Sequence, residues 1–599
     1  MNKLKIIIQK YFGSFTYFHK HLGYRIFVSL GLSLLVGVLD GFGLAMFIPL
    51  LQMVGGEGEN VNPEQMGNLA FLVEGLEALG ILLTLQTVLV ILLTFFTLKG
   101  VVKFFEGYYK VILQQIFIRK IRFSNIDLLS GYSYNSFVDS DAGRIQNTIS
   151  GEVERVMQAY RSYFSAFQNG ALVAVYMVLA FMSNAQFALL VMFGGALTNI
   201  VFDRFYKSTK VQSKLLTKES HAFQGLLIQK VANFKYLKAS GLVRVFSEKL
   251  KNSINYIEET QRRLGFLAAV LVAMREPVIM LVVVSVILIQ MKVLGGSLGL
   301  IILSLLFFYR ALTFLMAVQT HWNTFLSVSG SLDNMTEFTG DLAAHQESNG
   351  SIELRSFENK IELNDLDFFY KQEHVLKNIS LIIKKNETVA IVGESGSGKT
   401  TLMNILCGLL RVKYGMYHID GTDVNGLNMA TLQKRIGYIT QEPVIFNDTI
   451  FNNVTFWDKP NESNIGRFEN ALKLAAIFDF VMEQPEKLNA PLGHNGVMIS
   501  GGQKQRLSIA RELYKEVDFL FLDEATSALD SETEKSIQEN ISLLKGKYTI
   551  IIIAHRLSTV KDADKIIYLK DGTVESIGTF DELRQSSTKF NSLVEMNSL

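Results

Sequence analysis

A glycine-rich segment in the second half of the chain carries the residues best suited to hold phosphate groups. It reads GESGSGKTT, and Gly393 is followed five positions later by Gly398, Lys399 and Thr400. Glycines let successive backbone N–H groups point at one phosphate, and the start of the following helix adds a partial positive charge. The spacing matches the P-loop pattern, in which the lysine reaches the outer phosphates and the hydroxyl reaches Mg²⁺. The remaining predicted phosphate contacts are Ser395, Gly396, Ser397 and Thr401.

A pair of acids further along the chain adds the chemistry of hydrolysis. Residues 518–524, DFLFLDE, form a strand pattern that ends in two carboxylates. We expect Asp523 to hold Mg²⁺ through water and Glu524 to polarise an attacking water molecule. Taken alone, the two acids are also compatible with capping of the next helix. Together with the P-loop, they predict a nucleotide hydrolase that uses ATP and Mg²⁺.

The segment Ser500–Arg506, SGGQKQR, is similar to the signature motif of the ATP-binding-cassette (ABC) ATPases. This resemblance implies that one subunit's signature residues cover the ATP held by another subunit's P-loop. A helix N-terminus supplies the second half of such a phosphate cage. A homodimer is the simplest interpretation, and a heterodimer with a related half-transporter is the alternative. The residues of the signature that contact ATP on this interpretation are Ser500, Gly501, Gly502 and Gln503.

Other family positions occur in the expected order along the chain. Tyr370 matches the aromatic residue that stacks on adenine, and Gln441 matches the glutamine that binds Mg²⁺ and links the nucleotide to the membrane part. Asp530 lies in a matching dimer-contact loop, and His555 matches the switch histidine that contacts the γ-phosphate. The resemblance therefore implies that Glu524 and His555 are the catalytic residues.

Some positions depart from the family pattern. Lys371 follows Tyr370 where proline is common, and Ile499 precedes the signature serine where leucine is usual. The stretch before the signature also lacks the acidic residues that many exporters have there. These departures concern the coupling between subunits and leave the hydrolytic residues intact.

The first half of the chain has the composition of a membrane protein. Hydrophobic residues make up 49% of the 599 residues and charged residues only 19%, below the roughly 25% of soluble proteins. A helix needs about 20 apolar residues to cross a bilayer, and six stretches before residue 325 approach or exceed this length. They are residues 26–54, 79–98, 164–182, 185–202, 264–291 and 293–320. The sequence predicts six transmembrane helices and excludes a soluble globular enzyme.

The predicted fold is an α-helical membrane domain with long cytoplasmic extensions, followed by an α/β P-loop ATPase domain. The expected parts are a membrane domain at 1–330, a linker at 331–355 and an ATP-binding cassette at 356–599. Similarity to exporter-type half-transporters implies cytoplasmic turns near residues 134–143 and 221–227. A short amphipathic helix is expected within residues 66–80, either at the outer membrane interface or packed on the bundle.

The distribution of Lys and Arg predicts the orientation in the membrane, because cytoplasmic segments are enriched in both. The first 25 residues carry five basic and no acidic residues, and residues 204–263 carry thirteen basic against four acidic ones. The loop at 55–78 instead holds five Glu and no basic residue. Both termini are therefore expected in the cytoplasm of a bacterial cell, with the helices in its inner membrane.

Charges inside the apolar stretches are the best indication of what is transported, because they are costly there and usually face a cavity. Arg275 and Arg310 lie at comparable predicted depth, and in a dimer they would suit an oxyanion such as pyrophosphate. Ion pairing is the alternative, with Glu276 beside Arg275 and Asp40 available to neutralise Arg310. Together with pattern-level similarity to lipid-linked-oligosaccharide flippases, this favours a flippase for a lipid-linked oligosaccharide or a lipid A-like glycolipid.

Several other function classes were weighed against this hypothesis. A broad exporter of hydrophobic drugs is the second choice, and a peptide exporter is less favoured. A soluble cassette ATPase of DNA repair or translation conflicts with six spans in the same chain, and a gated channel conflicts with an intact hydrolytic pair. The net charge of +2 gives no reason to expect nucleic acid as a partner.

Overall fold

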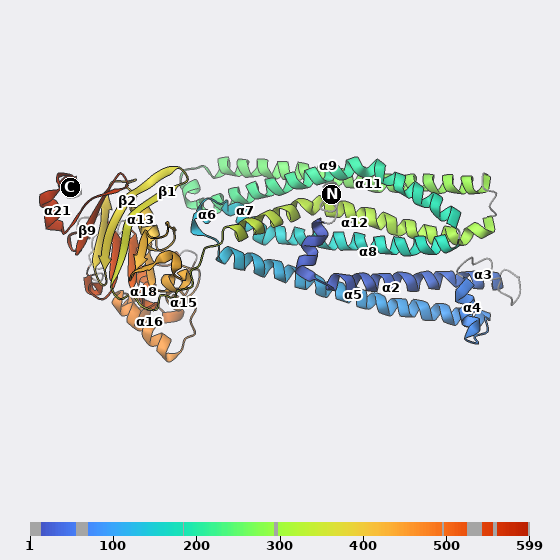
Figure 1. The fold of residues 1–599 in the computed structure, drawn as a ribbon, viewed down its shortest axis with the longest axis horizontal. Coiled ribbons are helices and arrows are strands. Elements are labelled where there is room, and N and C mark those ends of the chain that lie inside the picture. The colour runs from blue at the N-terminus through green and yellow to red at the C-terminus, as the bar shows by residue number, and fades with distance from the viewer. Residues whose placement is uncertain are drawn as a thin grey trace. The chain divides into compact units, whose positions relative to one another are not determined.

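Long helices build the first part of the chain, and strands mixed with helices build the second (Figure 1). The computed structural model describes residues 13–54, 70–183, 185–292, 298–493, 496–523, 539, 542–554 and 560–596. The first unit comprises Met1–Tyr132 and Asp139–Gln346, and the second comprises Ser133–Val138 and Glu347–Leu599. The short piece Ser133–Val138 therefore groups with the second unit although its neighbours in sequence belong to the first.

The first unit is helical throughout the described residues. Its long helices are α2 (Arg25–Ala45), α5 (Leu85–Ser130), α8 (Val153–Ser183), α9 (Ala185–Ala232), α11 (Val243–Lys292) and α12 (Leu298–Ala344). Shorter ones are α3 (Phe47–Val54), α4 (Phe71–Ala78), α7 (Ala142–Asn147), the π-helix η2 (Thr148–Glu152) and α10 (Phe234–Ala239). The short helix α6 (Tyr134–Val138) falls in the piece that groups with the second unit.

Membrane-spanning character is clear for part of this bundle. Within the described residues, four helical segments are long and apolar enough to cross a membrane. They are Arg25–Ala45, Leu85–Ser130, Ala142–Met182 and Val243–Ile289. The other two predicted stretches belong to α9 and α12, which are not among these four.

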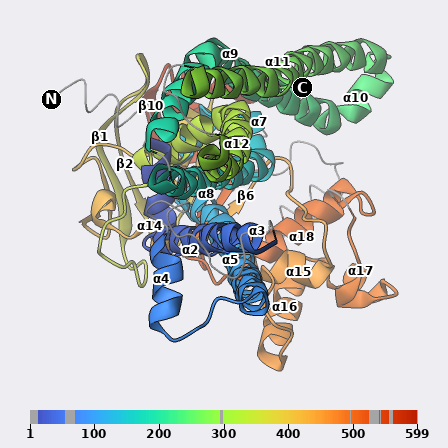
Figure 2. The same cartoon turned by 90° about the vertical axis from the view of Figure 1, so that its right-hand side faces the viewer.

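The helices pack in pairs that run side by side. α8 lies along α12, α9 along α11, and α2 along α5 (Figures 1 and 2). An aromatic cluster fills the bundle near the start of α2, where the rings of Phe18 and Phe117 lie 5.5 Å apart and those of Phe117 and Tyr160 lie 4.9 Å apart. Gly143 of α7 meets α9 closely, since a Cβ there would lie 2.6 Å from Cα of Gly225. Position 143 therefore requires glycine, whereas a Cβ at Gly225 would meet only Oδ1 of Asp141 at 4.0 Å.

Two expected connections differ from the structure. The turn predicted near 221–227 is wrong, because α9 continues to Ala232 and the chain reverses around α10. Gly225 lies inside this continuous helix, in close contact with Gly143. The first part of the predicted linker at 331–355 is also helical, because α12 continues to Ala344. The turn predicted near 134–143 is present, between the end of α5 and the start of α7.

The predicted amphipathic helix is present as α4. Its Val73 is completely buried and clusters with Leu44 of α2 and Tyr176 of α8. The helix therefore packs on the bundle, the second of the two expected arrangements. Residues 66–69 of the predicted segment lie outside the described residues.

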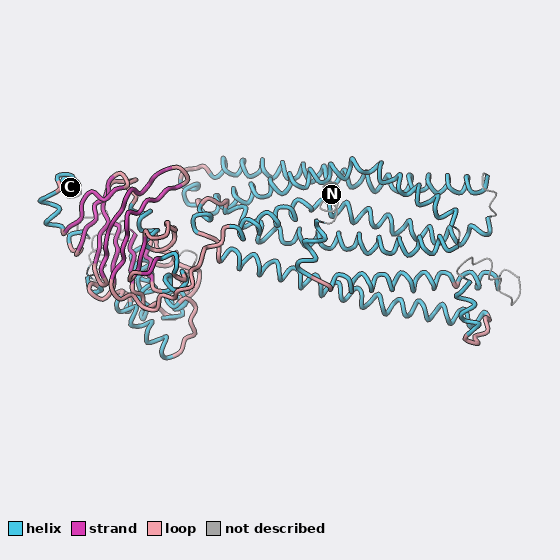
Figure 3. The backbone as a smooth tube through the Cα atoms, viewed as in Figure 1, coloured by secondary structure: helices cyan, strands magenta, loops and turns pink. Residues whose placement is uncertain are grey.

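The second unit contains two sheets (Figure 3). The larger has the strand order β10-β9-β3-β8-β7-β6, in which all strands but the edge strand β10 run parallel. The smaller, antiparallel sheet has the order β2-β1-β4-β5. The strands are β1 (Lys360–Tyr370), β2 (Glu373–Lys384), β3 (Thr388–Gly393), β4 (Tyr417–Ile419), β5 (Thr422–Asp423), β6 (Ile436–Ile439), β7 (Phe519–Asp523), β8 (Thr549–Ile553), β9 (Lys565–Lys570) and β10 (Thr573–Gly578).

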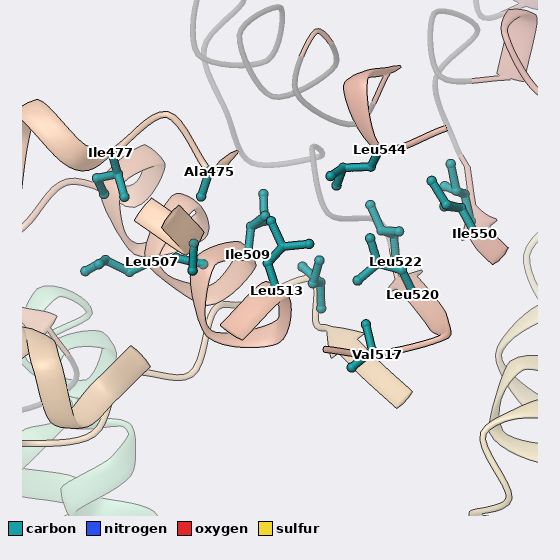
Figure 4. Close-up of a cluster of buried hydrophobic side chains, with 14 of the residues drawn as sticks. Ala475, Ile477, Leu507, Ile509, Leu513, Val517, Leu520, Leu522, Leu544 and Ile550 are labelled. Carbon is teal, nitrogen blue, oxygen red and sulfur yellow. The ribbon is translucent and has the colours of Figure 1, made fainter. Parts of the chain in front are cut away.

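Helices cover the larger sheet and bury its continuous apolar strands. Strand β8, TIIII, is buried at every position, as expected of a parallel strand covered on both faces. Figure 4 shows Leu507 and Leu513, which belong to the helix that begins in the signature motif, in one cluster with Leu520 and Leu522 of β7. The helices are α13 (Lys399–Leu406), α14 (Met429–Lys434), α15 (Ile450–Thr455), α16 (Glu462–Leu474), α17 (Phe478–Glu483), α18 (Gly501–Tyr514), α21 (Phe580–Ser586) and α22 (Thr588–Met596).

Candidate functional site

The glycine-rich loop connects β3 to α13, the strand–loop–helix arrangement that its pattern requires. Gly393, Gly396 and Gly398 have φ values of 155°, 82° and 99°, which side-chain-bearing residues rarely adopt. A Cβ at Gly393 would lie 2.2 Å from the carbonyl oxygen of Leu569, and one at Gly398 would lie 2.6 Å from Cδ2 of Leu376. The glycines are therefore needed both for the backbone path and for space.

The start of α13 offers an anion-binding surface. Gly398 caps the helix without a side-chain hydrogen bond, so the first N–H groups remain available. Lys399 is almost completely buried, and its Nζ donates to the carbonyl oxygens of Gly393 and Glu394, both at 2.9 Å. The hydroxyl of Ser397 is buried without a hydrogen-bond partner within the described residues. A cationic, glycine-lined cradle with an unsatisfied hydroxyl fits a polyphosphate.

Three of the predicted P-loop positions lie at the surface of this cradle. Ser395, Gly396 and Thr400 are exposed, and Thr400 follows Lys399 in the first turn of α13. A Cβ at Gly396 would meet nothing within 4 Å, so this residue faces open space. Their exposure leaves them accessible to a ligand.

The carboxyl ends of the parallel strands bring the acidic residue to the same edge of the sheet. Strands β3, β8, β7 and β6 are consecutive neighbours, with Ile391 opposite Ile553 and Asp523 opposite Ile553. Asp523 thus ends β7 close to the end of β3, where the P-loop begins. Gln441 follows two residues after the end of β6, and it is exposed at the same edge. The sheet therefore brings these predicted metal ligands toward the phosphate cradle.

Tyr438 is a neighbour of this acid that the sequence analysis did not single out. Its hydroxyl donates to Oδ2 of Asp523 at 3.3 Å. Burial, followed by the nearby Asp523 carboxylate, raises the pKa of Tyr438, so the phenol stays a hydrogen-bond donor. The residue lies on a strand only four residues long, and its partner becomes apparent only when β6 is paired with β7.

Tyr370 ends β1, and its hydroxyl is hydrogen-bonded to Thr401 of α13. The smaller sheet thereby places an aromatic ring beside the P-loop helix, and about a third of Tyr370 remains exposed (37%). Lys371 has a φ of 56°. Proline is restricted to a φ near −65° and cannot adopt this conformation. The departure from the family pattern at this position therefore follows from the tight turn between β1 and β2.

The signature motif forms the N-terminus of α18. Ser500 is the N-cap: its Oγ accepts from the backbone N–H of Gln503 at 3.3 Å, and its own N–H donates to Oε1 of Gln503 at 2.8 Å. Such a capping box fixes the helix end. Ser500 and Gly501 are exposed, and Gly502 and Gln503 are partly exposed. The motif therefore presents a fixed helix N-terminus at the surface.

Arg511 ties this helix to the segment that follows Gln441, a role that sequence reasoning missed. Its guanidinium is buried, donates to the carbonyl oxygens of Asn453 (2.6 Å) and Val444 (2.7 Å), and stacks over Phe446 at 5.2 Å. Burial lowers its pKa, but an arginine remains charged. An arginine among apolar residues of the signature helix was the available signal.

Packing between helices gives one of the intramembrane charges, Asp40, two partners. Asp40 pairs with Lys99 at 2.5 Å and accepts a hydrogen bond from the hydroxyl of Tyr176. Asp40 is therefore neutralised by Lys99 of α5, and the expected pairing with Arg310 is absent from the described residues. Arg310 is half-buried on α12 and has no ion-pair partner in the described part of the chain. Arg275 lies on α11, two residues before Pro277 in the middle of that helix.

The remaining predicted residues lie outside the described part of the chain. Glu524 and Asp530 follow β7, and His555 follows β8 by two residues. The strands that precede Glu524 and His555 both end at the edge of the sheet that carries the P-loop. Within the described residues, no group of three or more His, Cys, Asp or Glu residues is placed to hold a metal ion.

Comparison with known proteins gives matches to part of the second unit and to most of the chain. The family described as ABC transporter matches residues 376–527. An ATP-dependent lipid A-core flippase of Francisella tularensis subsp. holarctica (strain OSU18) is 30% identical over 514 residues, which cover 83% of each chain. The heterocyst differentiation ATP-binding protein HepA of Nostoc sp. (strain PCC 7120 / SAG 25.82 / UTEX 2576) is 27% identical over 498 residues, 82% of this chain and 81% of that one.

A solved structure shows the same fold. A bacterial Atm1-family ABC exporter with ATP bound has a TM-score of 0.76 at 22% identity, and the match covers 96% of this chain and 99% of that one. The likeness includes both the helical first unit and the α/β second unit.

Proposed function

Because the chain belongs to the ABC transporter family as an exporter-type half-transporter that couples ATP hydrolysis to transport, we propose that it flips an anionic, amphipathic lipid. The lipid class we favour is a lipid A-like glycolipid or a lipid-linked oligosaccharide, carried from the inner to the outer side of the membrane. The observation that carries this proposal is the match to a lipid A-core flippase over most of both chains. The P-loop of this chain forms a cationic, glycine-lined cradle, which supports ATP binding.

The P-loop and its neighbours are proposed to bind ATP as follows. Lys399 neutralises charge on the outer phosphates, the glycine N–H groups and Ser397 hold the phosphate oxygens, and Tyr370 stacks on the base. Mg²⁺ would neutralise the phosphate oxygens as charge develops on them. Thr400, Gln441 and Asp523 provide the oxygen ligands that this ion prefers.

Hydrolysis is assigned to two residues at the edge of the parallel sheet. Glu524 is proposed to orient and polarise the attacking water, and His555 to contact the terminal phosphate. Both follow strands that end beside the P-loop. The pKa of Tyr438 is raised, so its phenol can donate to Asp523 and hold that carboxylate in place throughout the cycle.

We also propose that the working unit is a homodimer. Ser500 and Gly501 form an exposed helix N-terminus, a feature that stabilises anionic groups. Within one chain, Ser500 forms its capping hydrogen bonds with Gln503. A second copy would place this helix end over the phosphates of the first, with Asp530 at the contact between the cassettes. A related half-transporter as the partner would give the same geometry.

In the membrane, the proposal requires six spans in each chain, contributed by the long helices α2, α5, α8, α9, α11 and α12. Both termini lie in the cytoplasm and the helices lie in a bacterial inner membrane, as the distribution of Lys and Arg predicts. Arg310 is half-buried without an ion-pair partner among the described residues. With Arg275 it is proposed to face the anionic part of the substrate.

Transport in proteoliposomes tests the proposed function. Purified protein in liposomes that contain lipid A should move this lipid between leaflets only with ATP and Mg²⁺, and lipid A should stimulate ATP hydrolysis. The Glu524→Gln variant should bind ATP but neither hydrolyse it nor move lipid. Stimulation and transport of a hydrophobic cation with no response to lipid A would replace this proposal with that of a multidrug exporter.

A further inference from the structure

The helical unit contains a cavity that is separate from the charges discussed so far. It has a volume of about 370 Å³, within the range of small-molecule sites. Residues of α8, α9, α11 and α12 line it. Its lining on α8, α9 and α12 lies outside the apolar stretches of these helices, and on α11 it reaches the start of the stretch at 264–291, where Leu264 and Ala268 line it. All four helices belong to the same unit.

Hydroxyl and amide side chains make up more than half of the lining residues. Gln158 of α8, Gln261 of α11 and Asn323 of α12 contribute amides. Ser213 and Thr217 of α9 and three residues of α12 contribute hydroxyls, and these α12 residues are Thr324, Ser327 and Ser331. A few apolar residues complete the wall. A hydrophobic ligand would leave these polar groups without partners, which costs free energy.

Arg155 is the one charged side chain in this lining, among the residues that the structure describes. Its nearest carboxylate, on Glu152, lies 3.8 Å from the guanidinium, beyond normal hydrogen-bond length. A guanidinium has five N–H donors, so most of them are available for a ligand. The cavity therefore has a net positive character and favours an anion.

Hydrogen bonds with buried residues outside the cavity hold several of the lining side chains in position. Glu152 is 1% exposed, accepts from Nδ2 of Asn147 at 3.3 Å and is hydrogen-bonded to Ser331. Two further contacts join α9 and α12: the hydroxyl of Thr209 donates to Oδ1 of Asn323 at 3.3 Å, and the N–H of Gly330 donates to Oγ of Ser213 at 3.0 Å. These hydrogen bonds order the polar side chains of the cavity before a ligand binds. The site is therefore preorganised, because the entropy of ordering these side chains is already lost in the free protein.

We propose that this cavity binds a hydroxyl-rich group that carries a phosphate, with Arg155 on the phosphate and the amides of Gln261 and Asn323 on the hydroxyls. Sugar phosphates have this chemistry, whether they form the headgroup of a membrane lipid or are free in solution. The proposal deepens the proposed function, since it assigns the polar part of the transported glycolipid to a particular site. It also predicts that selectivity depends on the headgroup more than on the acyl chains.

Binding to the full-length protein in lipid nanodiscs tests this inference. One arm titrates lipid A incorporated in the nanodisc and follows stimulated ATP hydrolysis. The other titrates soluble glucosamine 1-phosphate and follows both its direct binding by isothermal titration calorimetry and its competition with lipid A. We expect Arg155→Gln to raise the lipid A concentration for half-maximal stimulation at least tenfold, and Arg155→Lys to restore part of the affinity. If the site takes headgroups, glucosamine 1-phosphate competes in the wild type and loses this effect in Arg155→Gln.

A second variant guards against misfolding, because Arg155 lies near the buried Glu152. Gln261→Leu changes an exposed wall residue without touching Glu152, and we expect it to raise the half-maximal concentration three- to tenfold. Arg263→Gln is the matched control: Arg263 is exposed on the same helix, pairs with Glu259 at 2.5 Å and does not line the cavity. It should leave the lipid A response unchanged.

The outcomes separate the two proposals. If lipid A stimulates the wild type and both cavity variants equally, this inference is wrong and the proposed function stands. If lipid A never stimulates or moves, but glucosamine 1-phosphate binds the wild type and not Arg155→Gln, the site is right and the lipid function is wrong. Binding of neither probe to the wild type overturns the assignment of sugar phosphates.

Discussion

Lys399 is positioned for phosphate before any ligand arrives, because two loop carbonyl oxygens hold its ammonium group. Lys399→Ala removes a charge-assisted hydrogen bond to phosphate, each worth about 1.5–3 kcal/mol. We therefore expect the Kd for ATP to rise roughly 10- to 100-fold. Equilibrium binding of a fluorescent ATP analogue measures this. Lys384→Ala, an exposed lysine on β2, should bind like the wild type.

Two aspartates in the second unit should respond to pH with different signs. Burial is the largest cause acting on Asp518, and it raises the pKa of this carboxyl group. The guanidinium of Arg435, whose Nη1 lies 3.4 Å from Oδ2 of Asp518, only partly offsets this. The folded state therefore disfavours the ionised carboxylate, and its stability decreases as the pH rises from the unfolded value of about 4 through the raised one. Asp518→Asn should raise the melting temperature by about 1–3 °C at pH 8 and by less at pH 5.

Asp367 provides the control for this effect. The N–H of Asn378 at 3.1 Å, and then His374 at 2.8 Å, lower the pKa of Asp367. Its contribution is present above its unfolded value and is lost only as the pH falls through the lowered value. Asp367→Asn should therefore lower the melting temperature at both pH 5 and pH 8, opposite in sign to Asp518→Asn. A pH-independent effect of Asp518→Asn would contradict the assigned burial cost.

At this scale, local motifs could be read from the sequence, whereas contacts between elements could not. The glycines of the P-loop are required by the backbone path of nine consecutive residues, which the sequence contains in full. The pairing of Asp40 with Lys99 depends on how α2 packs on α5, and spacing along the chain does not determine that. The contact of Tyr438 with Asp523 likewise requires the register of β6 on β7.

The signature helix is the element whose end has two roles. Ser500→Ala removes the N-cap, and this type of change costs about 1 kcal/mol of stability. If Ser500 also contacts the partner's nucleotide, ATP hydrolysis by the intact transporter should fall at least tenfold. Differential scanning fluorimetry and a phosphate-release assay measure the two effects.

Thr579→Ala is the matched control, because Thr579 caps α21 by the same reciprocal bonds with Glu582. It should cost similar stability without loss of hydrolysis. Equal hydrolysis by Ser500→Ala and Thr579→Ala would reduce Ser500 to a helix cap.

Element types were predictable here because the apolar periods are long, but element ends were less so. The α9 helix has no proline, and Gly225, within the stretch where the turn is expected, lies in close contact with Gly143 of α7. Glycine permits both a turn and a close approach, and only the packed structure distinguishes them. Similarly, α12 continues past residue 331 because Leu332, Met335, Phe338 and Leu342 recur at helical spacing and are buried.

At the scale of the whole molecule, mixed dimers test the shared active site. Each composite site would combine one chain's Lys399 with the other chain's Ser500. Lys399→Ala and Ser500→Arg should each be nearly inactive alone. After co-assembly, half of the dimers should be mixed and contain one intact site, giving roughly a quarter of wild-type hydrolysis under two-fold symmetry.

The control mixes Lys399→Ala with Glu524→Gln. Both residues belong to the same chain's half of a site, so no mixed dimer contains an intact site. Recovery in this control, or none in the first mixture, would contradict the shared-site arrangement.

The overall division of the chain was accessible from composition, because an apolar half is followed by a half with alternating strand and helix patterns. Composition does not reveal which short segments group with which unit. Ser133–Val138 is a short segment between two long helices, and only its contacts assign it to the second unit.

The length of α9 has a mechanical consequence. Its 48 residues extend over about 72 Å, more than twice the ~30 Å of a hydrocarbon core. A rigid rod of this length that tilts by about 5° moves its far end by roughly 6 Å. The glycine contact with α7 lies near one end of the rod. Small rearrangements there would thus be geometrically amplified into displacements as wide as a sugar ring at the opposite end.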